Sequence, residues 1–127
     1  MARVNSAQIT ITREQAIRDG VLVDVSPVAV LLGWVAPVGF TRAAYAETCD
    51  CTPYERLKGF TPHLRVREVL EVARVAIMQA KEAEYILPCC VAIARSLDTV
   101  SAHRLQLVGH PYTPEGEFCL TIALWGE

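Results

Sequence analysis

The chain has 127 residues, of which 52% are hydrophobic. This length and composition predict a single domain over residues 1–127 with a buried core. Its 12 basic and 14 acidic residues give a formal net charge of −2, so there is no basic excess to bind nucleic acid. No apolar run reaches the roughly 18 residues of a membrane span, and residues 1–6 lack the apolar stretch of a signal peptide, so no membrane partner is expected.

The N-terminal part predicts a short helix followed by a strand. Apolar and polar residues alternate over 8–11, which is compatible with a short strand. Thr12 and Gln15 have the spacing of a capping box, in which each side chain bonds the backbone N–H of the other residue. Gly20 supplies the left-handed residue that ends such a helix. The β-branched residues in 21–25 favour a strand.

Two further short helices are expected. The dipeptide Ser26–Pro27 has the residue types of an N-cap and a first helical position, and predicts a helix over 28–34. Residues 35–40 contain a proline and a glycine, so they are expected to be extended or to turn. Thr41 is expected to cap a third helix over 42–49.

The longest predicted helix covers Leu64–Ala80, after a loop over 51–62 that is rich in proline and glycine. Its apolar residues recur at spacings of three and four and predict one buried stripe. The stripe consists of Val66, Val69, Leu70, Ala73, Ala76 and Ile77. The charged residues of this helix, including Arg65, are expected on the solvent side. Leu70 is expected to be buried against the sheet.

The C-terminal third predicts strands. Residues 85–94 favour a strand that Pro88 interrupts, as at an edge or a bulge, although the pattern of 85–101 leaves a helix after Pro88 open. Residues 103–108 and 117–124 alternate as strands do, and predict an antiparallel hairpin. The predicted fold class is α+β, with a small antiparallel sheet that ends in a C-terminal hairpin and three or four helices packed on one face.

The segment Thr12–Val25 reads Thr-Arg-Glu-Gln-Ala-Ile-Arg-Asp-Gly-Val-Leu-Val-Asp-Val, and is followed by Pro37–Tyr45, Leu64–Ala80 and Leu105–Leu124. In this order the four segments resemble a family of short, uncharacterised bacterial proteins common on phages, plasmids and other mobile elements. Tyr45 stands where that family usually has tryptophan. The resemblance implies a shared fold and a mobile-element origin, but it implies no known activity.

The cysteines and histidines do not form a recognisable site. The five cysteines are Cys49, Cys51, Cys89, Cys90 and Cys119. The first four form two pairs that are closer in sequence than paired zinc ligands usually are, so buried thiols are expected in place of a metal site. The odd number argues against a disulfide framework. The three histidines are His63, His103 and His110. No spacing joins a histidine to a cysteine as a catalytic pair, and no cofactor is expected.

Three charged residues near the N-terminus are a second group of candidates. Asp19 and Asp24 lie on either side of the turn at Gly20, where an aspartate commonly bonds backbone groups. Arg42 begins a predicted helix, and a helix N-terminus attracts anions. Structural or surface roles are expected for all three. A ligand site that uses them is the alternative.

Aromatic residues at the ends of predicted elements are candidate contacts for a protein partner. Trp34 follows a predicted helix, Tyr112 lies in the hairpin loop 109–116, and Trp125 follows the last strand. Tyr112 and Trp125 with this loop are the preferred contact surface, and Trp34 and Arg42 are further candidates. The alternative is that Trp125 packs onto the core.

These observations predict a protein that is not an enzyme. It is expected to come from a phage or other mobile element and to bind and inhibit a host protein, such as a CRISPR effector subunit or another component of antiviral defence. Small size, the lack of a catalytic motif and the resemblance support this expectation, with the bacterial cytoplasm as the location. A small accessory enzyme or ligand-binding domain that uses Asp19, Asp24 and Arg42 is the alternative. The oligomeric state is left open.

Overall fold

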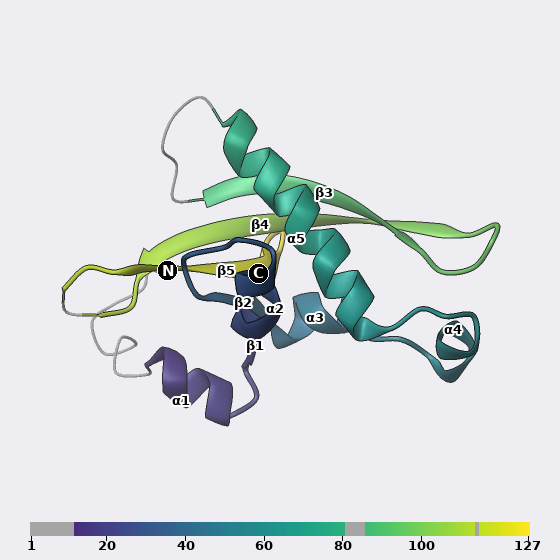
Figure 1. The fold of residues 1–127 in the computed structure, drawn as a ribbon, viewed down its shortest axis with the longest axis horizontal. Coiled ribbons are helices and arrows are strands. Elements are labelled where there is room, and N and C mark those ends of the chain that lie inside the picture. Colours follow the sequence, from purple (N-terminus) through teal and green to yellow (C-terminus); the bar gives the residue numbers. More distant parts are fainter. Residues whose placement is uncertain (1–11, 81–85, 114) are drawn as a thin grey trace.

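The computed structural model describes residues 12–80, 86–113 and 115–127 (Figure 1). In chain order its elements are α1 (Arg13–Arg18), β1 (Leu22–Asp24), α2 (Ser26–Leu31), β2 (Val38–Thr41), α3 (Arg42–Thr48), α4 (Pro53–Leu57), α5 (Pro62–Gln79), β3 (Ile86–Ala94), β4 (Val100–Pro111) and β5 (Phe118–Leu124). The predicted α+β class is confirmed. The strand suggested for residues 8–11 lies outside the described residues.

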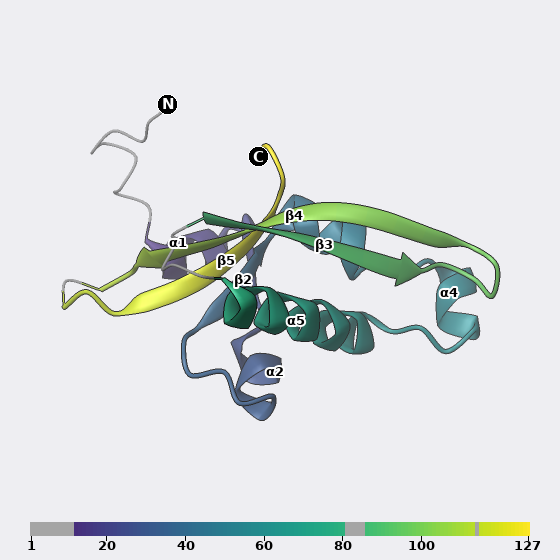
Figure 2. The ribbon, with the colours of Figure 1, turned by 90° about the horizontal axis from the view of Figure 1, so that it is seen from above.

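The strands form one five-stranded sheet in the order β1-β2-β5-β4-β3. All neighbouring pairs are antiparallel except β2 and β5, which are parallel, so the sheet is mixed and mostly antiparallel. The predicted C-terminal hairpin is β4–β5, and β3 extends it by a second hairpin. Helices α2 and α5 lie on the same side of the sheet (Figure 2).

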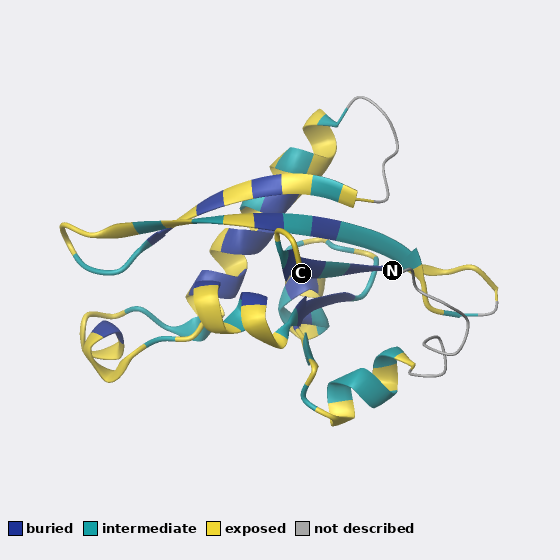
Figure 3. Cartoon of the chain, turned by 180° about the vertical axis from the view of Figure 1, so that it is seen from behind, coloured by how far each residue is buried: buried dark blue, intermediate teal, exposed yellow. Residues whose placement is uncertain are grey.

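The ambiguous segment is a strand. Residues Ile86–Ala94 pair with β4 over their whole length. Pro88 is tolerated because β3 is an edge strand of the sheet. An N–H that is missing on the open side of an edge strand costs no hydrogen bond to a neighbouring strand. Buried and exposed residues alternate along β3 (Figure 3). Cys89 therefore points into the core, whereas Cys90 is exposed on the other face.

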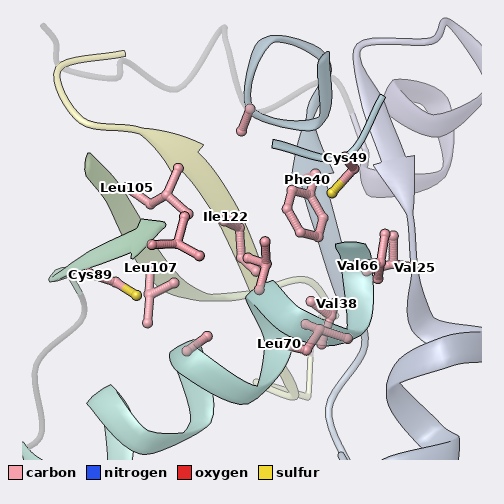
Figure 4. Close-up of a cluster of buried hydrophobic side chains, with 14 of the residues drawn as sticks. Val25, Val38, Phe40, Cys49, Val66, Leu70, Cys89, Leu105, Leu107 and Ile122 are labelled. Carbon is pink, nitrogen blue, oxygen red and sulfur yellow. The ribbon is translucent and has the colours of Figure 1, made fainter. Parts of the chain in front are cut away.

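Helix α5 covers the centre of the sheet. Leu70 has no exposed surface, which confirms the expectation for this residue, and it lies beside Val38 of β2 (Figure 4). Val66, Val69 and Ala73 complete the buried stripe. The prediction is wrong for Ile77, which is 42% exposed. The reason is that Ile77 lies on the flank of α5 that faces the end of α2, where it lines an open hollow with Trp34 and Val35.

The start of the described chain folds largely as predicted. Gly20 ends α1 with a φ of 76°, and Oγ1 of Thr12 accepts a hydrogen bond from the N–H of Gln15 at 3.1 Å. The reciprocal half of the predicted capping box is wrong. The side chain of Gln15 instead donates to Asp19 and accepts from Arg18.

The predicted cap of α2 is also wrong, whereas that of α3 is confirmed. Ser26 is the first residue of α2 and not its N-cap. Its hydroxyl donates to Asp24 and accepts from the N–H of Val38 at 3.0 Å, so it links the end of β1 to the start of β2. Thr41 caps α3 as expected, because its Oγ1 atom accepts from the N–H of Ala44.

Residues 51–62, predicted as a loop, contain the short helix α4. Oγ1 of Thr52 accepts from the N–H of Glu55 at 3.1 Å, and the Glu55 carboxylate accepts from the N–H of Thr52 at 2.8 Å. This is a complete capping box with Pro53 in the first turn. The Thr-x-x-Glu spacing is therefore a sequence pattern from which this helix could be predicted.

The prediction that Arg65 faces solvent is wrong. Arg65 is 1% exposed, and its Nη2 atom lies 2.9 Å from Oε2 of the buried Glu55. The guanidinium also donates to the carbonyl oxygens of Asp50 and Ala94. Its Cζ atom lies 5.0 Å from the centroid of the Phe60 ring. One side chain thus joins the segment after α3, helices α4 and α5, and the end of β3.

Glu55 is held in its ionised form. The hydrogen bond from the N–H of Thr52 is the main reason that its pKa falls from 4.5 to about 2. Burial acts in the opposite direction, but hydrogen bonds from Arg65 and Arg95 add to the lowering. The carboxylate therefore remains charged and neutralises the buried guanidinium.

Arg95 extends this network to the start of β4. Its Nη1 atom lies 3.3 Å from Oε2 of Glu55, and its Nε atom donates to Ser101. Its Nη2 atom donates to the carbonyl of Glu47, whose carboxylate lies 3.2 Å from Nδ1 of His103. His103 is therefore part of a structural network.

Replacing Leu70 with alanine should lower the free energy of unfolding by about 2–5 kcal/mol, because it leaves a cavity in a closed core. Urea denaturation measures this change. Met78→Ala on the same helix is the control, because Met78 is 74% exposed, and it should change stability by less than about 0.5 kcal/mol. Equal effects of the two substitutions would contradict the placement of α5.

Replacing Glu55 with glutamine should destabilise the fold by about 3–5 kcal/mol at pH 7, because it leaves a buried arginine without its counter-charge. Since the folded-state pKa of Glu55 is lowered from 4.5 to about 2, its ionisation stabilises the fold above the unfolded-state pKa. That contribution is lost as the pH falls from 4.5 towards 2. Urea titrations across this range should show a shallower decline for Glu55→Gln than for the wild type.

The exposed Glu68 of α5 provides the matched control. Glu68→Gln should keep both the stability and the pH profile of the wild type. A Glu55→Gln variant as stable as Glu68→Gln would show that the buried ion pair does not hold the helices together.

Candidate functional site

An exposed apolar surface lies where the end of α2 meets the C-terminal half of α5. Gly33 follows α2 with a φ of 91° and turns the chain, so that the next two residues lie beside α5. A hollow of about 450 Å³ is lined by Gly33, Trp34, Val35, Arg74, Ile77 and Met78. These six residues are referred to below as the Trp34 surface.

The apolar side chains of the Trp34 surface are unusually exposed. Val35 is 100% exposed and Met78 is 74% exposed. A second hollow of about 170 Å³ follows along the contact between α2 and α5, and it includes Leu31, which is 79% exposed. Grouped exposed apolar side chains of this kind mark interaction sites on soluble proteins.

Trp34 is the fixed part of this surface. Its backbone N–H donates to the carbonyl of Ala29 at 3.1 Å, and its ring packs against the core. Among the described residues its buried indole N–H has no acceptor. Arg74 donates to the carbonyl of Leu32 and thereby ties α5 to the end of α2. The candidate Trp34 thus lies on an apolar surface beside an arginine and a methionine.

The other two aromatic candidates lie apart from each other. Tyr112 is 38% exposed just before the β4–β5 turn, and Trp125 is 44% exposed after the end of β5. Strand β5 lies between them, and at the usual rise per residue its length is roughly 20 Å. Trp125 is covered on one side by Arg104, whose Cζ atom lies 4.3 Å from the centroid of the indole ring. The structure therefore does not bring the two into one surface.

Asp19, Asp24 and Arg42 are not brought together by any hydrogen bond or ion pair among the described residues. Burial raises the pKa of Asp24, but hydrogen bonds from Ser26 and Arg13 outweigh it, so the pKa lies below its usual value. Arg42 donates to the carbonyl of Gly20 at 3.4 Å. Each side chain has a local structural contact, and the two hollows described above do not include them.

The structure brings together one cysteine and one histidine that the sequence did not connect. His110 and Cys119 face each other on β4 and β5, and Nε2 of His110 lies 3.5 Å from Sγ of Cys119. The same Nε2 atom lies 2.9 Å from Oγ1 of Thr121. Cys119 is 2% exposed, and its burial raises the pKa of the thiol. A buried thiol with a raised pKa is a poor nucleophile, so the pair is best explained as packing.

The described cysteines are free thiols. Within residues 12–80, 86–113 and 115–127, no three histidine, cysteine, aspartate or glutamate residues are placed to hold a metal ion. Burial raises the pKa of Cys49 to about 11 and also raises that of Cys89. These thiols are therefore protonated and shielded at neutral pH.

Thiol reactivity provides a test of this arrangement. In dilute folded protein at pH 8, Cys90 should react rapidly with a thiol reagent because it is exposed, and the half-buried Cys51 should react more slowly. The three buried thiols, Cys49, Cys89 and Cys119, should react only after unfolding. Mass spectrometry of the labelled peptides identifies each site. Rapid labelling of Cys119 in the folded protein would contradict the buried pair with His110.

No described helix has the length and apolar character that crossing a membrane requires. Comparisons of the chain with family models, curated proteins and solved structures find no match. The mobile-element origin that the motif resemblance implies stays a prediction.

Proposed function

We propose that this protein is a non-enzymatic binding protein that acts by occupying another protein through the Trp34 surface. The observation that supports this most directly is the fully exposed Val35 beside the half-buried ring of Trp34. An apolar side chain that remains in water contributes no hydrophobic stabilisation. When a partner covers it, the binding free energy becomes more favourable by about 25 cal/mol for each Å² of apolar area that is buried.

The composition of the Trp34 surface supports the same proposal. Tryptophan, methionine and arginine are enriched at the centres of protein interfaces. Here Trp34, Met78 and Arg74 line one hollow. A rigid aromatic ring that already packs against the core loses little conformational entropy on binding. A flexible methionine adapts to the shape of the partner.

The proposed target is a host protein of an antiviral defence system, such as a CRISPR effector subunit. The resemblance of Thr12–Val25 to mobile-element proteins supports this target, since such elements gain from blocking host defence. The alternative, a small enzyme or ligand-binding domain at Asp19, Asp24 and Arg42, has less support because those side chains are engaged in local contacts.

Charged substitutions on the Trp34 surface should weaken target binding without unfolding the protein. Val35→Asp and Met78→Asp change highly exposed positions, so the melting temperature should stay within a few degrees of the wild type. Each should weaken the target complex at least tenfold, because an ionised carboxylate must then be buried at the interface. Capture of a stoichiometric partner from bacterial lysate, followed by titration with that purified partner, measures the effect.

Leu97→Asp is the matched control, because Leu97 is also fully exposed but lies in the β3–β4 turn. It should bind the target as the wild type does. Tyr112→Ala and Trp125→Ala test the other aromatic candidates in the same assay. The proposal fails if no stoichiometric partner is recovered, or if the partner is lost only on changing Tyr112 or Trp125.

A further inference from the structure

The two edge strands of the sheet differ in how well they are protected. Edge strand β1 has three residues, one of which is the charged Asp24. Edge strand β3 has nine residues, Ile86–Ala94, and none of them is charged. Short edges and charged residues normally prevent a sheet from pairing with another chain. By this criterion β1 is protected and most of β3 is not.

The hydrogen-bond pattern shows which groups of β3 are free to pair. The N–H of Trp125 donates to the carbonyl of Arg104, so the even-numbered residues of β4 bond towards β5. Odd-numbered residues of β4 therefore bond to β3, and the register pairs Leu105 with Cys89. It follows that the even-numbered residues of β3 direct their backbone groups to the free edge. The carbonyl of Ala94 there already accepts from Arg65, so the groups available to pair are those of Pro88, Cys90 and Ala92. Pro88 has an even number and lacks an N–H, which agrees with this assignment.

Both faces of this edge are largely apolar. On one face, an open groove of about 440 Å³ separates β3 from α5, and its lining includes Val72 and Val75 together with the polar Glu71 and Gln79. Val75 is 50% exposed, and this end of α5 extends beyond β3 (Figure 1). On the other face, Cys90 and Ala92 are exposed. A strand added at the edge would therefore meet mainly apolar side chains on both sides.

We propose that β3 of a second copy of this chain covers the edge, in antiparallel orientation, and joins the two sheets into one. Even-numbered residues then face even-numbered residues across a two-fold axis. With the axis beside Cys90 or Val91, Pro88 lies opposite Ala92 or Ala94 of the second copy. Pro88 still accepts a hydrogen bond there through its carbonyl.

A second copy fits this edge better than a flexible segment of another protein. Its β3 is already held in the extended conformation by β4, so little conformational entropy is lost on pairing. Because neither β3 strand carries a charge, no like charges face each other. A stable dimer needs about 800 Å² from each partner. The nine-residue edge and the overhanging flank of α5 both contribute to that area.

The test is the mass of the purified wild-type protein in solution, measured by light scattering over a concentration series. The expected mass approaches twice the 14.0 kDa of one chain as concentration rises. Ala92→Pro removes an N–H from the free edge and spares the bonds to β4. Ala92→Lys places a charge beside the second copy. Each should raise the dimer dissociation constant at least tenfold, and thermal unfolding checks that each variant folds.

Ala102→Lys is the matched control. Ala102 is the exposed neighbour of Ala92 on β4, one strand further from the edge, and this variant should dimerise as the wild type does. A protein that remains monomeric at every concentration overturns the proposal. A dimer that persists in both Ala92 variants also overturns it. The same holds for a dimer that Val35→Asp dissociates and the two Ala92 substitutions do not. No target protein is present in this experiment, so its failure leaves the proposed role of the Trp34 surface unaffected.

Discussion

Arg65 and Glu55 form an ion pair that is withdrawn from water near the start of α5. Burying two charges is costly unless each is paired and hydrogen-bonded, and here both conditions are met by contacts from the segment between α3 and α4 and from the end of β3. The carbonyl groups of Asp50 and Ala94 accept from the guanidinium, and Thr52 donates to the carboxylate. Since these contacts fix the first turns of α5, they also determine how the rest of the helix crosses the sheet. Its middle, around Leu70, covers the core, and its C-terminal end extends past β3.

This placement leaves apolar side chains on both flanks of the C-terminal half of α5. On the flank next to α2, Ile77 and Met78 join Trp34 and Val35 around one hollow. On the flank next to the sheet edge, Val72 and Val75 line the groove along β3. A shorter helix would expose neither flank. The two proposed interaction surfaces are thus consequences of one structural arrangement, and the partners proposed for them differ.

Local signals in the sequence predict most of the elements. Gly20, Thr41 and the spacing of the apolar residues around Leu70 each act through their own neighbours, so they can be interpreted without the fold. Contacts that depend on the tertiary arrangement were missed. From its position in the sequence, Arg65 is expected to face solvent, and only the placement of Glu55 on α4 shows its buried partner. His110 approaches Cys119 only through the register of β4 and β5. Trp34 was a candidate from its position alone, but its hollow also needs Ile77, which the periodicity assigned to the core.

Residue-resolved amide hydrogen exchange along β3, at low and high protein concentration, tests most directly whether the exposed flank of α5 and the sheet edge form an interface. In the dilute monomer, the N–H groups of Leu87, Cys89 and Val91 bond to β4 and should exchange slowly, whereas those of Cys90 and Ala92 should exchange rapidly. At high concentration the edge amides should become slow as well, while those of Gly33–Val35 remain unchanged without a target. Alternating fast and slow exchange that persists at every concentration would contradict pairing at this edge.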